Sequence, residues 1–140
     1  MSNPNSPENR TYSLADVLAA GELADASRVA ERLSWLQTKF RDCDPCLVIA
    51  EFSPGITAVA KSHVPVITAG SGYSLPAAVT PLPLLAFCEQ SLPATTVQKE
   101  NRLLEAFNKG QVNLGLSPSG SLASLFRSQE NFVCTFDCFD

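Results

Sequence analysis

Cysteine is the residue type in this chain with the clearest potential for site chemistry. Cys43 and Cys46 form a C-x2-C pair, and Cys134 and Cys138 form a C-x3-C pair. Four thiolates can hold a zinc ion, so the two pairs together could supply a metal site. The second pair, however, falls in the apolar run FVCTFDCF, where a strand would hold its sulfurs apart. We therefore interpret the cysteines as small buried or half-buried thiols and predict no metal and no cofactor.

Other catalytic arrangements lack a necessary residue. His63 is the only histidine, and it falls in a polar turn without a nucleophile at a recognisable spacing. The segment Gly70-Ser71-Gly72 has neither the Lys-Ser/Thr ending of a phosphate-binding loop nor the third glycine of a dinucleotide fingerprint. The chain is accordingly predicted not to be an enzyme. The remaining catalytic alternative is a thiol-dependent activity through Cys43 or Cys46, which would require a low thiol pKa.

Composition predicts one domain. The chain has 140 residues, of which 45% are hydrophobic, and a formal net charge of −4, so it can bury a single core and shows no electrostatic footprint for nucleic acid. Residues 1–10 are predicted to be a disordered tail, and residues 11–140 to form the domain. The first residues lack the pattern of a signal peptide, and no apolar run is long enough to span a bilayer. Together with five cysteines, an odd number, this favours a soluble, cytoplasmic protein with reduced thiols and no membrane contact.

Two helices are expected before residue 45. Ser13 and Asp16 form a capping-box-like pattern for a helix over 14–20, and Asp25 precedes an amphipathic helix that extends to about residue 40. The two helices resemble a helix-turn-helix in spacing, with Arg28 and Arg32 on the exposed face of the second. A recognition helix needs more basic or amide side chains than these. We therefore favour a structural helix pair, and direct DNA contact stays an open alternative.

Three strands are expected next, at 46–52, 56–62 and 65–69. The turn signal Ser53-Pro54-Gly55 separates the first two, and apolar and polar residues alternate in the second. Strands this close in sequence are predicted to run antiparallel. The fold class that follows is α+β, a mainly antiparallel sheet with flanking helices.

The remainder of the chain adds helices and late strands. Thr80 and Pro81 are placed to begin a helix that extends to about residue 90, and the free amides of its first turn would attract anions. A second helix is predicted from Thr95 to a Lys109-Gly110 stop. The last elements expected are a strand at 112–116, one or two helical turns within 121–127, and a strand at 132–139.

This order of elements resembles the effector-binding domain of IclR-type transcription regulators, which has a GAF-like fold. The similar residues are those of a Gly-x-x-Leu-Pro turn, the helix after it and a late strand that ends in Phe-Asp. They are Gly72, Leu75, Pro76, Ala78, Thr80, Leu84, Leu85, Ala86, Phe139 and Asp140. The chain departs from the family where alanine replaces a histidine and where Pro81-Leu82-Pro83 replaces a Gly-Lys segment.

The resemblance implies a pocket and a function. Its lining would include Ala78, Val79, Thr80, Cys134 and Phe136. The implied function is sensing of a small organic acid or similar metabolite in transcription regulation, by a domain that acts through a homodimer or a partner protein. The competing hypothesis is a protein interaction module that pairs through a sheet edge or the late strand, because unpaired strand edges attract other chains.

Overall fold

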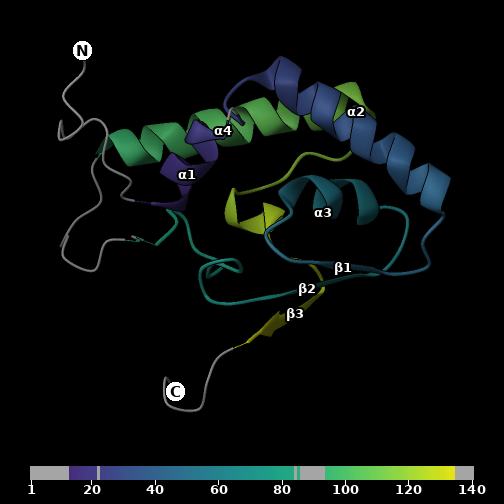
Figure 1. Ribbon diagram of the computed structural model, residues 1–140. Helices are drawn as coiled ribbons and strands as arrows, with labels where there is room; N and C mark the ends of the chain where they lie inside the picture. Colours follow the sequence, from purple (N-terminus) through teal and green to yellow (C-terminus); the bar gives the residue numbers. More distant parts are fainter. Residues whose placement is uncertain (1–12, 22, 84, 86–93, 135–140) are drawn as a thin grey trace.

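The protein is a layered arrangement of helices on a small sheet. A computed structural model describes residues 13–21, 23–83, 85 and 94–134. Figure 1 shows α2 and α4 in an upper layer, α3 in the middle and the three strands below. None of the helices in the described ranges is long and apolar enough to cross a membrane. In chain order the elements are α1 (Leu14–Ala20), α2 (Ala26–Cys43), β1 (Val48–Ala50), α3 (Pro54–Ala60), β2 (Val66–Gly70), α4 (Ala94–Asn113), the 3-10 helix η2 (Ala123–Leu125) and β3 (Glu130–Val133).

The sheet is parallel throughout, so the predicted antiparallel, GAF-like sheet is wrong. The strand order is β1-β2-β3, and both pairs are parallel. Ile49 stands beside Ile67 across the first pair, and Ala69 stands beside Phe132 across the second. A further bond continues the second ladder, because the Cys134 N–H donates to the Gly70 carbonyl at 2.8 Å. What remains of the predicted fold class is a combination of helices and one sheet.

The parallel direction of β1 and β2 follows from α3, which forms where the second strand, at 56–62, was predicted. Two parallel neighbours need a crossover connection, and a helix usually provides it. Ser53 precedes Pro54, whose fixed φ suits the first position of a helix. The Thr57 hydroxyl and N–H then both donate to the Ser53 carbonyl, at 2.9 and 3.1 Å. These local bonds turn the chain into a helix at the point where the alternating pattern predicted a strand.

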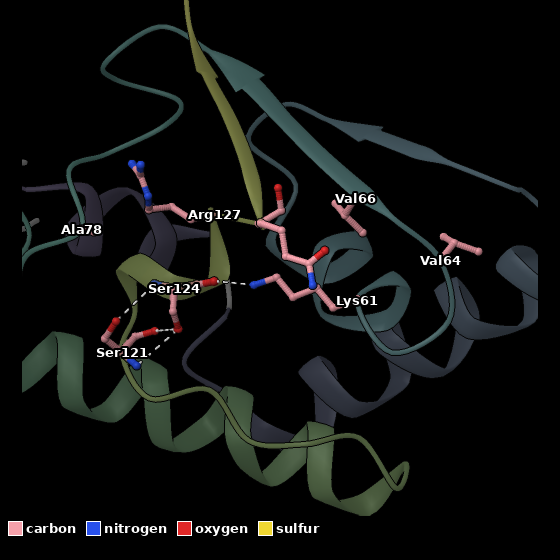
Figure 2. A pocket seen from close by; sticks show the side chains of 9 residues that line it. Lys61, Val64, Val66, Ala78, Ser121, Ser124 and Arg127 are labelled. Carbon is pink, nitrogen blue, oxygen red and sulfur yellow. Dashed lines mark hydrogen bonds between the residues drawn. The ribbon is translucent and has the colours of Figure 1, made fainter.

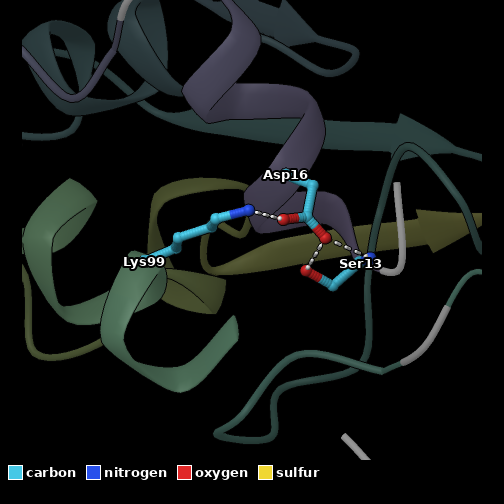
Figure 3. A network of polar contacts seen from close by, with 3 residues as sticks. All are labelled: Ser13, Asp16 and Lys99. Carbon is cyan, nitrogen blue, oxygen red and sulfur yellow. Dashed lines mark hydrogen bonds and ion pairs between the residues drawn. The ribbon is translucent and has the colours of Figure 1, made fainter. Parts of the chain in front are cut away.

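The two N-terminal helices are confirmed at the predicted caps. The Asp25 carboxylate accepts from the Ser27 N–H at 2.9 Å and from the Ser27 hydroxyl at 2.6 Å, which starts α2. The Asp16 carboxylate accepts from the Ser13 N–H at 2.9 Å and the Ser13 hydroxyl at 3.3 Å. It also forms an ion pair with Lys99 of α4, with Nζ and Oδ1 2.7 Å apart. Figure 3 shows this network, which connects the start of α1 to α4.

The core lies between the helices, where α2 crosses α4. Leu33 of α2 and Leu103 of α4 are almost fully buried, as are Leu14 of α1 and Leu125 of η2. The predicted stop of α4 at Gly110 and the predicted strand at 112–116 are wrong, because α4 continues to Asn113. Gly110 is buried against α2: a methyl group on its Cα would lie 2.8 Å from Cγ1 of Val29 and 3.2 Å from the Ala30 nitrogen. The glycine therefore permits a close helix crossing and does not end the helix.

The other late elements differ from the prediction in extent. Residues 81–83 are not helical, and the remainder of the helix predicted to 90 lies, apart from Leu85, outside the described residues. The helical turns predicted within 121–127 are η2. The last strand begins earlier than predicted, at Glu130, and residues 135–139 of the predicted strand lie outside the described ranges.

Candidate functional site

A cavity of about 480 Å³ lies between the end of α3, the start of β2 and the segment that connects η2 to β3. Lys61 follows α3 directly, Val66 is the first residue of β2, and Ser128 precedes β3. Ala78 reaches the cavity from the loop after β2. Figure 2 shows these side chains around the cavity. Its polar lining consists of Lys61, Ser121, Ser124, Arg127, Ser128 and Gln129.

Lys61 supplies one of the two cations. Its Nζ donates to the Ser124 carbonyl at 2.7 Å, which uses one of the three ammonium hydrogens. Although much of the side chain is exposed, the ammonium end is partly desolvated, and this desolvation lowers the pKa of Lys61. A lowered pKa means that the charged form lacks compensation for the water it has lost. A bound anion would provide that compensation.

Arg127 supplies the second cation. One guanidinium nitrogen donates to the Pro76 carbonyl at 2.9 Å, so that the side chain holds the loop after β2 against the segment before β3. A guanidinium has five N–H donors, and this bond uses one of them. In Figure 2 the Arg127 side chain is directed towards the loop that carries Ala78. In the described part of the chain, neither Arg127 nor Lys61 forms a salt bridge with a carboxylate.

Local hydrogen bonds hold the serines of the site in place. The Ser124 N–H donates to the Ser121 hydroxyl at 3.2 Å, and the Ser124 hydroxyl donates to the Ser121 carbonyl at 2.7 Å. Ser128 is fixed in the same way, since its N–H donates to Oδ1 of Asn131 at 3.1 Å. That oxygen also accepts from the Thr68 hydroxyl of β2 at 2.7 Å. The segment on one side of the cavity is therefore anchored to the sheet before any ligand binds.

The opposite end of the sheet is filled by the chain itself. Ligands of open parallel sheets usually bind beyond the carboxyl ends of the strands. Here Ser74 folds back against Gly70 so closely that a methyl group on Gly70 would collide with its hydroxyl. The same hydroxyl donates to the Glu51 carboxylate at 3.3 Å, and the rings of Phe52 and Tyr73 stack with centroids 5.7 Å apart. These contacts occupy the carboxyl ends of β1 and β2.

The residues predicted to line a pocket are not brought together as a group. Ala78 lies on the cavity lining. Val79 and Thr80 are exposed in the same loop, and Cys134 is exposed at the end of β3, beside Gly70. Phe136 lies outside the described residues. Cys43 and Cys46 are also exposed, so the prediction of buried or half-buried thiols is wrong for the three described cysteines. The described residues contain no group of three or more His, Cys, Asp or Glu side chains that could hold a metal ion.

Sequence reasoning missed Lys61 and Arg127. Lys61 was placed on a strand, and Arg127 near the end of a short helical segment, so that no shared spacing connected them. The available signal was Ser53-Pro54-Gly55, which can begin a helix as well as a turn. A helix there would have predicted a parallel sheet and placed Lys61 at the helix end that favours a cation.

Comparison with known proteins gave no relative. The chain matches no protein-family model. No curated protein matches it, and no solved structure matches it either. The site is therefore interpreted from its own geometry and chemistry.

Proposed function

We propose that the protein binds a small organic acid in the cavity between Lys61 and Arg127. The observation that carries this proposal is that both cations line one cavity without a carboxylate partner among the described residues. A partly desolvated cation usually has an anionic partner, because the loss of water would otherwise go uncompensated. A ligand carboxylate would provide that partner for each cation.

The size and lining of the cavity limit the class of ligand. Its volume of about 480 Å³ lies in the range that small-molecule sites usually have. Arg127 can bind a carboxylate through two parallel hydrogen bonds, while Lys61 acts as a point charge. The hydroxyls of Ser121 and Ser124 add donors and acceptors for a polar ligand. A compact di- or tricarboxylate, or a hydroxy acid, fits this combination best.

The role of binding in this proposal is sensing, as the sequence suggested. The Lys61 ammonium group donates to the backbone carbonyl of Ser124 and not to a serine hydroxyl, an arrangement suited to holding a ligand. Control of transcription, which the family resemblance implied, rested on a GAF-like fold and loses that support with the parallel sheet.

Replacing Lys61 with methionine should weaken acid binding without unfolding the protein. Calorimetric titration of the full chain with succinate, malate and citrate is expected to show saturable binding by at least one acid. A hydrogen bond to a charged group is worth about 1.5–3 kcal/mol, so Lys61→Met should lower the affinity by about tenfold or more. The matched control is Lys39→Met, which removes an exposed cation of α2 that pairs with Asp42 at 3.6 Å.

Two results would contradict this proposal. One is the absence of both binding heat and any rise in melting temperature with all three acids, since a ligand specific for the native state must stabilise it. The other is equal loss of affinity in Lys39→Met and Lys61→Met, which would indicate general charge attraction.

A second candidate function is association through the sheet face that is turned away from the helices. Ile49, Ile67, Ala69 and Phe132 share this face by strand register, together with Glu130, which stands beside Ile67. Ile49 is 69% exposed and Phe132 is 56% exposed, although parallel sheets usually have both faces covered. Figure 1 shows the labelled helices on the other side. The homodimer that the sequence suggested would cover this largely apolar face.

Light scattering during size-exclusion chromatography tests this association. We expect a concentration-dependent dimer, and a shift to monomer in Ile49→Lys, because the new ammonium group would be buried in the interface. Val112→Lys is the control, since Val112 is another exposed apolar residue, at 58%, on α4. A monomer at every concentration, or equal dissociation in both variants, would remove this second candidate.

A further inference from the structure

A second cavity, of about 530 Å³, lies between α1, α2 and the beginning of α3. It is separate from the Lys61 cavity, because it adjoins Pro54, Gly55 and Ile56 at the first turn of α3, whereas Lys61 follows the last turn. Its lining is mainly apolar. The side chains that matter here are Val17 of α1, Leu33 and Leu36 of α2, Phe52, Ile56 of α3 and Phe107 of α4.

Part of the wall of this cavity is fixed in advance. Leu33 and Phe107 belong to the buried core, with 1% and 3% of their surface exposed. The Phe52 ring is held between two others, with centroids 5.7 Å from Tyr73 and 5.3 Å from Phe126. A wall that is already ordered loses little conformational entropy when a ligand binds. Val17, Leu36, Phe52 and Ile56 are only half-buried, so a ligand would remove apolar surface from water.

Arg32 is the single charged residue among those described as lining the cavity. It lies on the exposed side of α2 and forms no salt bridge with a carboxylate in the described part of the chain. An adjoining depression is lined by Arg32 together with Arg28, Glu31 and Trp35, and Trp35 is 58% exposed. The cavity therefore combines an apolar interior with a guanidinium group where α2 meets solvent.

We propose that this cavity binds an amphiphilic monocarboxylate, with its alkyl or aryl group in the interior and its carboxylate on Arg32. A compact polar acid would leave the apolar walls in contact with water, which is unfavourable. A neutral hydrocarbon would fill the interior but leave the guanidinium group unused. An acid with one charged end and an apolar chain satisfies both parts of the site, and it differs in kind from the polar acids assigned to the Lys61 cavity.

Trp35 provides a direct measurement, because it is the only tryptophan in the chain and lies beside Arg32. Titration of the full chain with decanoate, below the concentration at which decanoate forms micelles, is expected to change the Trp35 emission saturably. Acetate should produce no change, and 1-decanol should bind more weakly than decanoate. Arg32→Gln should lower the decanoate affinity by about tenfold and reduce the difference between decanoate and decanol. Arg41→Gln, which removes an exposed cation near the end of α2, is the matched control.

Gly55→Leu tests the cavity itself. A methyl group on Gly55 would lie 2.7 Å from Cδ1 of Leu36 and 3.7 Å from Cδ2 of Leu33, and both leucines line the cavity. The nearer contact is the end of a flexible side chain, which can turn aside. Leucine also has a higher helix propensity than glycine. The variant should therefore keep its circular dichroism spectrum at the temperature of the titration, with a melting temperature that overpacking can lower, and should lose the decanoate response.

The proposal would be overturned by the absence of a saturable decanoate response, by an unchanged response in folded Gly55→Leu, or by equal binding of decanol and decanoate that Arg32→Gln does not alter. Lys61→Met should bind decanoate as the wild type does. A loss of decanoate binding in that variant would place the ligand in the other cavity and would also overturn the proposal. Failure of succinate, malate and citrate to bind would leave the decanoate result unaffected, so that the two proposals are tested separately.

Discussion

Gly110→Ala is expected to lower the free energy of unfolding by about 1–3 kcal/mol, the usual cost of an overpacked site. In an ordinary helix the same change stabilises by about 1 kcal/mol, because alanine is the better helix former. Here the new methyl group would lie 2.8 Å from Cγ1 of Val29 and 3.2 Å from the Ala30 nitrogen. The backbone of α2 cannot turn aside as a side-chain end can, so the two helices must separate. Urea denaturation followed by circular dichroism measures the loss.

Gly120→Ala is the control for this prediction. A methyl group there would have no heavy atom within 4 Å, and Gly120 lies in the loop before η2. Its free energy of unfolding should change little, or rise slightly through reduced flexibility of the unfolded chain. Equal or greater stability of Gly110→Ala relative to the wild type would show that α2 and α4 are farther apart than the structure places them.

The elements that sequence predicted correctly are those determined by neighbouring residues. The helix over 14–20 depends on Ser13 and Asp16. The helix α2 depends on Asp25 and on an apolar stripe that is long enough to show a helical rather than an alternating period. α3 was missed because seven residues cannot separate a helical from an alternating pattern. That one error made the predicted strand pairing antiparallel instead of parallel, since a turn after β1 predicts an antiparallel neighbour and a helix predicts a parallel one.

The sequence could not predict features that depend on contacts between residues far apart in the chain. Gly110 has the local pattern of a helix end, and only the approach of α2 explains why glycine is needed within α4. The candidate site depends on the same kind of information. Lys61 follows α3 and Arg127 precedes β3, so the two cations are far apart in sequence. Each is oriented by a backbone carbonyl, that of Ser124 for Lys61 and that of Pro76 for Arg127. Ala78 was predicted to line a pocket from a family resemblance. Lys61 and Arg127 belong to no sequence motif that could have indicated a site.

Replacing Glu100 with alanine is also expected to lower the free energy of unfolding, because its buried carboxylate supports the loop before α4. Glu100 is 4% exposed, and its Oε1 accepts from the N–H of Leu82, which is fully buried, at 2.7 Å. Glu100→Ala leaves that N–H without its acceptor, which costs about 1–3 kcal/mol. Glu100→Gln keeps an oxygen at the same place and should retain most of the stability. Urea denaturation of both variants measures the difference, and equal stabilities would show that the hydrogen bond to Leu82 contributes nothing.

The two variants also differ in their dependence on pH. Desolvation raises the pKa of Glu100 above its ordinary value of 4.5, against the opposing effect of the Leu82 hydrogen bond. The folded state therefore holds the proton more tightly than the unfolded state, and the stability this provides is complete below pH 4.5 and lost as pH rises through the raised pKa. Glu100→Gln should abolish this decrease.

Glu105→Gln is the control on the same helix. The Lys109 ammonium group lowers the pKa of Glu105, so the contribution of Glu105 to stability has the opposite sign and is lost as pH falls. If the decrease with rising pH persisted in Glu100→Gln, another group would be its source, because a carboxamide at this position has no proton to release in this range.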